Sequence, residues 1–283
     1  MAAYHRPTDL GAALQILRNE PATQILAGAT DVYPAWIGTL AAGHARNSVD
    51  VLDITRIGGM KGIADRGDHW WMGALTTWSE IVRSDLPALF HGLKAAAREI
   101  GGVQIQNRGT IVGNICTASP AGDSIPCLLA LDAEIECVEG TAFRVPLAQF
   151  ITGYRKVVLD GGLVTGIRIP KRPGRGYFLK LGARRYLVIS IAMVSGTFDI
   201  DDTTHIIRSA RIAVGACSAV AQRLSKLEAR LAGTRIGDIH PNADDLAHLA
   251  PIDDVRANAA YRRAAALQLV ADLLVDAGTR RCV

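Results

Sequence analysis

The first of two glycine-containing segments that could bind a ligand lies near the N-terminus, at residues 25–32. It reads Ile-Leu-Ala-Gly-Ala-Thr-Asp-Val, so a predicted buried strand ends in small residues. Small side chains let the backbone approach a ligand, and successive N–H groups in such a turn can bind an anion. From this segment alone an ordinary strand-to-loop turn is favoured, because short loops of glycine, threonine and aspartate are common turn sequences.

The second segment, residues 101–123, is longer and more polar. It holds five glycines, seven uncharged polar side chains, Arg108 and Asp123, and it shows no helix or strand periodicity. A loop of this length in a compact domain is typical of a binding loop. Threonine, asparagine and exposed glycine amides suit a diphosphate, and each charge-assisted hydrogen bond contributes about 1.5 to 3 kcal/mol. Asp123 suits a ribityl or ribose hydroxyl better than a phosphate. The alternative is a structural loop whose polar groups bind one another.

Several well-known catalytic motifs are absent from the sequence. It contains no G-x-G-x-x-G after a strand, no G-x-x-x-x-G-K-[ST], no G-x-S-x-G and no H-E-x-x-H. The sequence therefore lacks the motifs that usually identify Rossmann dehydrogenases, P-loop enzymes, α/β-hydrolases and zincins. The seven histidines include no pair spaced by three or four residues, and the five cysteines include no Cys-x-x-Cys pair. We expect no metal site, no disulfide framework and a reducing compartment.

The composition is typical of a compact globular protein. Of 283 residues 49% are hydrophobic and 20% charged, and the net charge of +4 is a small difference between 31 basic and 27 acidic residues. Disorder is excluded, and the basic residues form no stripe that would predict nucleic-acid binding. No signal peptide is visible, and the longest largely apolar stretch is under half of the ~20 residues that a membrane helix needs. The expected location is the cytoplasm.

The elements that must position the two segments alternate irregularly, which predicts an α+β fold. Thr8 is expected to cap a helix between strands, so that the first 55 residues or so form a small β-α-β lobe. Thr77 and Glu80 then have the spacing of a capping box. Strands are predicted at residues 24–27, 49–54, 70–72, 133–138 and 163–169, and helices at residues 89–100 and 124–131.

A basic stretch with proline and glycine, residues 171–176, is the predicted linker to a C-terminal lobe of antiparallel strands and helices. The predicted domains are residues 1–172, with sub-lobes of about 1–55 and 56–172, and residues 177–283. Within the C-terminal lobe, strands are predicted at 177–181, 187–200 and 205–214, and helices at 222–231 and 254–276.

Three motifs follow one another along the chain. They are Ala-Gly-Ala-Thr-Asp at residues 27–31, Gln-Asn-Arg-Gly-Thr-Ile-Val-Gly-Asn at 106–114 and Ala-Ser-Pro-Ala-Gly-Asp at 118–123. Together they resemble the FAD-binding medium subunit of molybdenum hydroxylases. This family includes the flavoprotein parts of xanthine dehydrogenase, of carbon monoxide dehydrogenase and of dehydrogenases of N-heteroaromatic compounds. The resemblance covers the whole chain, because Lys-Leu-Gly-Ala-Arg-Arg at 180–185 resembles the start of the family's C-terminal flavoprotein domain.

The resemblance implies that residues 1–172 form an FAD-binding domain. It places the FAD diphosphate against residues 27–31 and 110–114, and Asp123 at the ribityl or adenosine side. Lys180 would lie at the pyrimidine edge of the flavin, where a cation stabilises an anionic reduced flavin. The full set of predicted FAD-binding residues is Ile25, Leu26, Ala27, Gly28, Ala29, Thr30, Asp31, Val32, Ile100, Thr110, Ile111, Val112, Gly113, Asn114, Asp123, Val164, Lys180 and Tyr186.

Three of these residues have less direct roles. The resemblance places Ile100 near the cofactor and Val164 beside the isoalloxazine. Tyr186 is our own candidate for a ring that covers or gates the flavin, and a structural core tyrosine is the alternative. No residue of the chain is expected to be catalytic.

The sequence departs from the family pattern at two positions. Ala29 and Val112 stand where many members have glycine. If φ stays negative, the added side chain can point away from the ligand, so we expect altered packing around the diphosphate without loss of FAD. Cys116, Cys127 and Cys137 are spread over different predicted elements, and we expect them to be structural thiols.

The resemblance also implies partners. A large subunit would carry the molybdopterin cofactor, and a small subunit would carry [2Fe-2S] clusters. Electrons would pass from these clusters to the FAD of this chain and on to an external acceptor, in a dimer of heterotrimers. The alternatives are a self-sufficient FAD-dependent reductase and a non-enzymic nucleotide-binding module. The candidate acceptors are NAD, a quinone, a cytochrome and oxygen, and the substrate is selected on another chain.

Overall fold

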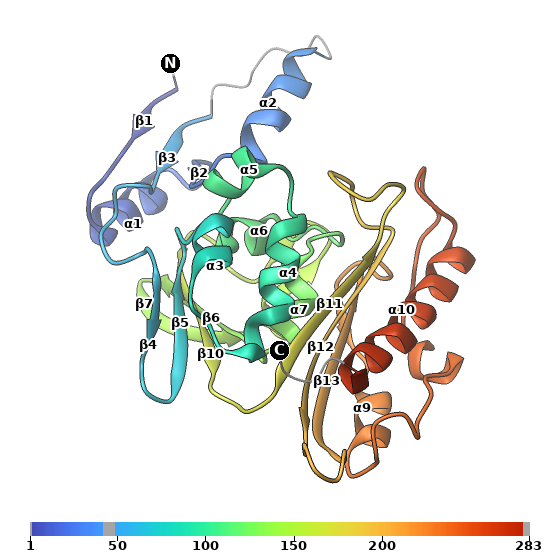
Figure 1. Cartoon of the computed structure of the whole chain (residues 1–283). Coiled ribbons are helices and arrows are strands. Elements are labelled where there is room, and N and C mark those ends of the chain that lie inside the picture. The colour runs from blue at the N-terminus through green and yellow to red at the C-terminus, as the bar shows by residue number, and fades with distance from the viewer. Residues whose placement is uncertain (1, 42–48, 280–283) are drawn as a thin grey trace.

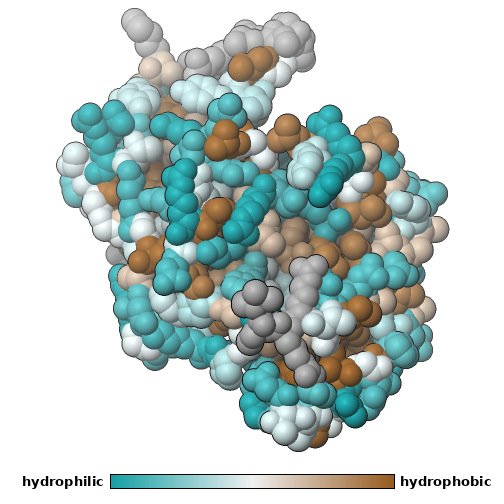
Figure 2. Space-filling model, in the orientation of Figure 1, coloured by the Kyte–Doolittle hydropathy of each residue, from teal (hydrophilic) through white to brown (hydrophobic). Residues whose placement is uncertain are grey.

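The computed structural model describes residues 2–41 and 49–279 (Figure 1). The chain forms a small N-terminal lobe, a larger middle lobe and a C-terminal lobe, each with helices and strands, as the α+β prediction requires. On the face shown in Figure 2, hydrophilic residues predominate and hydrophobic residues gather towards the centre. Within residues 2–41 and 49–279, no helix is long and apolar enough to cross a membrane.

The N-terminal lobe is a parallel sheet with two helices. Its elements are β1 (Tyr4–His5), α1 (Leu10–Asn19), β2 (Gln24–Leu26), α2 (Val32–Ala41) and β3 (Val51–Asp53). The strands lie in the order β1-β3-β2, and both outer strands run parallel to β3. Helix α1 buries Ala13, Leu14 and Leu17, which are the positions that its apolar spacing predicts.

Two details of this lobe differ from the prediction. Asp9, not Thr8, caps α1, and its side chain accepts a hydrogen bond from the N–H of Ala12 at 2.9 Å. The N-cap stands directly before the first helical residue, and because α1 begins at Leu10, Thr8 lies one position too early. Helix α2 was not predicted, because its sequence is apolar without an amphipathic period.

The middle lobe is an antiparallel sheet covered by helices. Its strands lie in the order β4-β5-β10-β6-β7, and their bounds are β4 (Ile63–Asp65), β5 (His69–Gly73), β6 (Glu134–Glu139), β7 (Thr141–Pro146) and β10 (Leu163–Pro170). A short antiparallel pair, β8 (Ile151–Gly153) and β9 (Lys156–Val157), follows α8 (Leu147–Phe150). The helices are α3 (Trp78–Arg83), η1 (Ala88–Phe90), α4 (His91–Glu99), α5 (Val103–Arg108), α6 (Ile111–Thr117) and α7 (Ser124–Ala130).

The prediction of one long loop over residues 101–123 is wrong. The structure has α5 and α6 in this segment. Helix α6 is capped by Thr110, whose side chain accepts from the N–H of Gly113 at 3.0 Å, and it ends at the left-handed Ala118. With six and seven residues, the two helices are too short for a period to stand out among the glycine and polar residues.

The predicted capping box of α3 is confirmed. The side chain of Thr77 accepts from the N–H of Glu80 at 3.3 Å, and the carboxylate of Glu80 accepts from the N–H of Thr77 at 2.7 Å. The same end of α3 contacts the connection between α5 and α6, because the N–H of Trp78 donates to the carbonyl of Gly109 at 3.2 Å. The start of α3 therefore supports the second glycine segment.

Replacing Thr77 with alanine should lower the free energy of unfolding by about 1 kcal/mol, because the first turn of α3 loses its cap. Thr77→Ser retains the hydroxyl and should stay close to the wild type. The measurement is equilibrium unfolding by denaturant. Equal midpoints for the wild type and Thr77→Ala would show that the cap contributes nothing.

The C-terminal lobe is an antiparallel sheet in the order β11-β12-β13-β14. Its elements are β11 (Arg175–Leu181), β12 (Ala192–Ile200), β13 (Ile207–Gly215), β14 (Gln222–Arg223), α9 (Ser225–Leu231), η2 (Ala243–Leu246) and α10 (Ala259–Thr279). Helices α9 and α10 pack on this sheet, and α4 and α7 of the middle lobe also contact its strands (Figure 1). Two predicted helix starts are too early, because residues 222–223 form β14 and α10 begins at Ala259.

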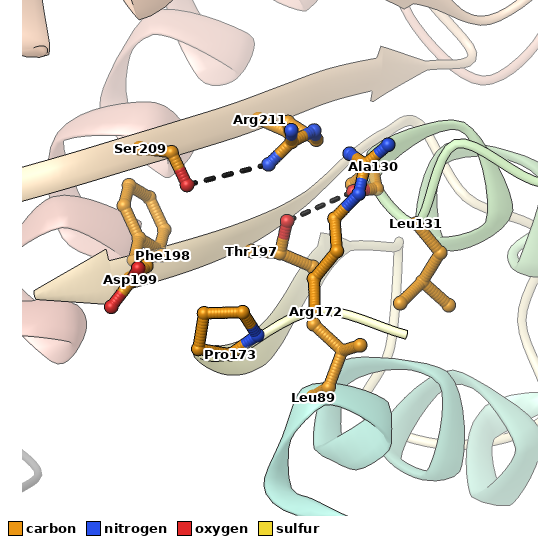
Figure 3. Close-up of a pocket in the computed structure, with 10 residues that line it drawn as sticks. All are labelled: Leu89, Ala130, Leu131, Arg172, Pro173, Thr197, Phe198, Asp199, Ser209 and Arg211. Carbon is orange, nitrogen blue, oxygen red and sulfur yellow. Dashed lines mark hydrogen bonds between the residues drawn. The ribbon is translucent and has the colours of Figure 1, made fainter. Parts of the chain in front are cut away.

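A polar cluster joins the middle and C-terminal lobes. Asp132, in the turn after α7, accepts hydrogen bonds from Arg172, from Nε of Arg211 at 2.6 Å and from Nη1 of Arg223 at 2.7 Å. Burial is the largest influence on the pKa of Asp132 and acts to raise it, but the three guanidinium groups together lower it below its ordinary value. Figure 3 shows Arg172 and Arg211 beside the buried hydrogen bond from Thr197 Oγ1 to the carbonyl of Ala130, 2.9 Å long.

Candidate functional site

The two glycine segments meet in space although about 80 residues separate them in the sequence. A Cβ atom on Gly28, just after β2, would lie 1.9 Å from the carbonyl oxygen of Arg108 at the end of α5. One on Gly109 would lie 3.3 Å from Oγ1 of Thr30. The first segment, from the N-terminal lobe, is thus in direct backbone contact with the second segment, from the middle lobe.

The first segment also presents backbone donors. The N–H groups of Gly28, Ala29 and Thr30 make no hydrogen bond to any described residue. Successive N–H groups in a turn form a concavity that binds anions. The segment therefore has the donors that a diphosphate requires, and its small side chains leave room for the phosphate oxygens.

The second segment contributes the start of α6. Ile111 and Val112 face the core, whereas Gly113 and Asn114 are half-buried. The side-chain carbonyl of Asn114 accepts from Oγ of Ser124 at 2.7 Å, which fixes the orientation of that amide. The Asn114 amide is therefore held in place by another side chain of the protein.

The backbone of the first segment corrects one expectation. Ala29 has φ of +64°, so it lies in the left-handed region and not at the negative φ expected for it. This conformation costs an L-residue roughly 1–2 kcal/mol, which explains why glycine suits this position. Val112 lies within α6 and keeps a helical backbone, with its side chain buried away from the surface.

A buried ion pair lies between the middle and C-terminal lobes. Nζ of Lys180, on β11, donates to Oδ2 of Asp123 at 2.7 Å, and the two side chains are 9% and 7% exposed. Oγ of Ser190 donates to the other carboxylate oxygen at 2.6 Å. Burial raises the pKa of the Asp123 carboxyl above its ordinary value, and Lys180 and Ser190 oppose part of this rise. Asp123 and Lys180, predicted at different parts of the flavin, are thus in contact with each other.

An open pocket of about 460 Å³ adjoins Lys180. It lies between α4, strand β11 and the loop that follows β11, and its volume is in the range of small-molecule and cofactor sites. Ile100 stands directly after α4, next to the pocket-lining Glu99. The lining residues are Ala95, Glu99, Phe178, Leu179, Lys180, Leu181, Gly182, Arg184, Arg185 and Val188.

The remaining two predicted residues have contrasting environments. Val164, on β10, is 4% exposed and belongs to the core of the middle lobe. Tyr186 is 60% exposed, and the guanidinium of Arg185 lies 5.2 Å from its ring centre. The alternative of a core tyrosine is therefore wrong for Tyr186.

Sequence reasoning missed Ser190. The signal for it was a single serine inside the apolar run of residues 187–194, where a buried hydroxyl needs a partner. Its partner, Asp123, is 67 residues away in the sequence. No local pattern could have identified the pair.

Cysteine and histidine are the residue types that most often bind transition metals. Cys127, Cys137 and Cys217 are buried and Cys116 is exposed, all with free thiols, and burial raises the pKa of Cys127 to about 12. Cys282 lies outside the described residues. His5, Glu20 and Asp50 place one ligand atom each within 4.8 Å of one another, and Nε2 of His5 lies 3.4 Å from Oε2 of Glu20. This group joins β1, the end of α1 and the residue before β3.

Matches to known proteins cover nearly the whole chain. Residues 1–172 match the family model of the FAD binding domain in molybdopterin dehydrogenase, and residues 178–277 match that of the CO dehydrogenase flavoprotein C-terminal domain. The chain is 29% identical to the nicotine 6-hydroxylase medium subunit of Paenarthrobacter nicotinovorans, over 98% of this chain and 97% of that protein. It is 32% identical to the xanthine dehydrogenase FAD-binding subunit of Escherichia coli O157:H7, over 61% of this chain and 59% of that protein.

A solved structure has the same fold. It is that of carbon monoxide dehydrogenase from Hydrogenophaga pseudoflava, which lacks the Mo-pyranopterin moiety of the molybdenum cofactor. The match has a TM-score of 0.90 and 26% sequence identity, and it covers 99% of this chain and 98% of that chain. The similarity therefore includes all three lobes and their arrangement.

Proposed function

The chain belongs to the family of FAD-binding subunits of molybdopterin dehydrogenases, and we propose that it transfers electrons within a molybdenum hydroxylase. It is a subunit of an oxidoreductase, and its cofactor is FAD. In the proposed reaction sequence, a large partner hydroxylates the substrate at a molybdopterin cofactor. Electrons then pass through [2Fe-2S] clusters of a small partner to this chain, which delivers them to an external acceptor.

The observation that carries the proposal is the meeting of the two glycine segments. The N–H groups of residues 28–30, which donate to no described residue, and the start of α6 lie together, and they would hold the FAD diphosphate. The full set proposed to bind FAD is residues 25–32 and 110–114 with Ile100, Asp123, Val164, Lys180 and Tyr186. FAD supplies the redox chemistry, because it exchanges electrons in one- or two-electron steps. The chain's own residues bind and orient it, and none acts as a general acid or base towards the substrate.

The proposed assembly is a dimer of heterotrimers in the cytoplasm. Its support is that the relatives are medium or FAD-binding subunits of larger enzymes. The proposed division within this chain places an FAD-binding domain at residues 1–172 and a C-terminal flavoprotein domain at 177–283.

Purification of the full-length tagged chain from its own cells, with cofactor and subunit analysis, tests the proposal. We expect one FAD per chain, with oxidised-flavin absorbance, and two further chains that carry molybdopterin and iron–sulfur clusters. A yellow chain that purifies alone and oxidises a reductant by itself would instead favour the self-sufficient reductase. A colourless chain that binds another nucleotide would favour the non-enzymic module.

A further inference from the structure

The side chain of Ser190 is buried beside the only carboxylate that Lys180 contacts among the described residues. Ser190 is 1% exposed and lies where the loop after β11 turns into β12. Its hydroxyl donates to Oδ1 of Asp123, and Lys180 donates to Oδ2 of the same group. The two oxygens of Asp123 are therefore bound from two different segments of the C-terminal lobe.

The backbone around Ser190 is fixed from both sides. The N–H of Ile191 donates to the carbonyl of Leu181 at 2.8 Å, which closes the loop. The carbonyl of Ile191 accepts from Nη1 of Arg262 at 2.6 Å, and this arginine, on α10, is 3% exposed. Ser190 thus has little freedom to move away from Asp123, so its hydrogen bond is a fixed feature of the site.

We infer that Ser190 is a positioning residue that keeps Asp123 ionised and paired with Lys180, and so sets the charge that this pair presents to the flavin. This inference rests on the proposed function, because it assumes FAD beside Lys180. Ser190 would not touch the reacting atoms. It acts through Asp123.

The groups around Asp123 determine in which direction loss of the Ser190 hydroxyl shifts the pKa of Asp123. Lys180, from β11, is the cation that contacts the carboxylate, and Ser190 is the neutral donor. Cys127, on α7, lies close to Asp123, but its thiol has a pKa of about 12 and stays neutral. A hydrogen bond to a charged acceptor shifts the equilibrium between the ionised and neutral forms towards the ionised form, by roughly tenfold or more. Loss of the Ser190 hydroxyl therefore raises the pKa of Asp123 further.

A neutral Asp123 changes the environment of the flavin. The ion pair has a net charge near zero, whereas Lys180 beside a neutral carboxyl has a net positive charge. Positive charge near the pyrimidine edge stabilises the anionic reduced flavin. At pH values between the Asp123 pKa of the wild type and that of Ser190→Ala, the variant should have the higher flavin reduction potential. A tenfold change in the ratio of reduced to oxidised flavin corresponds to about 30 mV for a two-electron couple.

The test uses the purified complex with bound FAD and measures the flavin midpoint potential across the pH range in which the complex is stable. We expect Ser190→Ala to shift the inflection of the pH profile to higher pH and to raise the potential by about 30 mV in that window. Thr197→Val is the matched control, because Thr197 is likewise buried, at 6% exposed, but its hydroxyl donates to the carbonyl of Ala130 and not to Asp123. Its profile should follow that of the wild type.

Two outcomes would overturn the inference, and both differ from failure of the proposed function. One is a Ser190→Ala profile equal to that of the wild type, and the other is an equal shift in Thr197→Val. If Ser190→Ala does not fold, Ser190→Cys, with its weaker donor, should give a smaller shift in the same direction, and no shift would again contradict the inference. A wild-type complex without FAD would refute the proposed function itself.

Discussion

Replacing Gly28 with alanine should weaken FAD binding by about 100-fold or more. The new Cβ would lie 1.9 Å from the carbonyl oxygen and 2.7 Å from the carbonyl carbon of Arg108, so the two glycine segments must move apart. Backbone lies on both sides of this contact, and no flexible side chain can rotate away. Overpacking of this kind costs about 3 kcal/mol, which is about 100-fold in affinity. The measurement is FAD content and FAD affinity of the purified complex.

Gly58→Ala is the matched control for this experiment. Gly58 also lies in a connection that follows a strand of the N-terminal lobe, but a Cβ there would meet nothing within 4 Å. The Gly58→Ala variant should bind FAD with the affinity of the wild type. If Gly28→Ala retained full FAD affinity with an intact fold, the meeting of the two segments would not be the diphosphate site.

Replacing Asp132 with asparagine should lower the free energy of unfolding by about 2 to 3 kcal/mol at neutral pH. Arg172, Arg211 and Arg223 would then face one another without the carboxylate, and removal of one partner from a partly buried ion cluster is costly. We place the value below that of a fully buried pair, because the Asp132 side chain is 32% exposed. Asparagine keeps the size of the side chain and tolerates the left-handed backbone at this position, where φ is +51°.

The effect of Asp132→Asn should depend on pH. The guanidinium groups depress the folded-state pKa of Asp132, so its stabilising contribution is complete above the unfolded-state pKa and is lost as the pH falls through the folded-state pKa. The difference in unfolding free energy between wild type and variant should therefore shrink in acid. Asp202→Asn, at an exposed position, is the control and should change little. A constant difference at all pH values would show that charge is not the cause.

The sequence predicted the fold best where one local pattern determined the structure. The Thr77 capping box, helix α1 and the middle-lobe strands β5, β6 and β10 follow from spacing and residue type, whereas β7, β8 and β9 were not predicted. The short helices α5 and α6 could not be predicted, because a helix of two turns has no distinct period and is held by contacts with α3 and the core. The prediction placed the N-cap of α1 at Thr8 instead of Asp9, because these two adjacent polar residues are both common N-cap types.

The candidate site could be proposed from the sequence as a set of segments but not as an arrangement. Motif order selected residues 27–31, 110–114 and Asp123 as candidates. It contained no information on the contact between Gly28 and Arg108, or on the pairing of Lys180 with Asp123, because both join residues that are far apart in the sequence. The glycine that many family members have at the position of Ala29 was the available signal for its positive φ, because glycine adopts this backbone readily and alanine rarely does.

The contact between Gly28 and Arg108 also bears on the order in which the chain folds. Contacts between distant residues form late, because closing the intervening chain costs entropy before any packing offsets it. The two glycine segments come from the N-terminal and middle lobes, so they meet only once these lobes have docked. FAD would thus bind only at the end of folding. Its binding would stabilise only the molecule in which both lobes are docked.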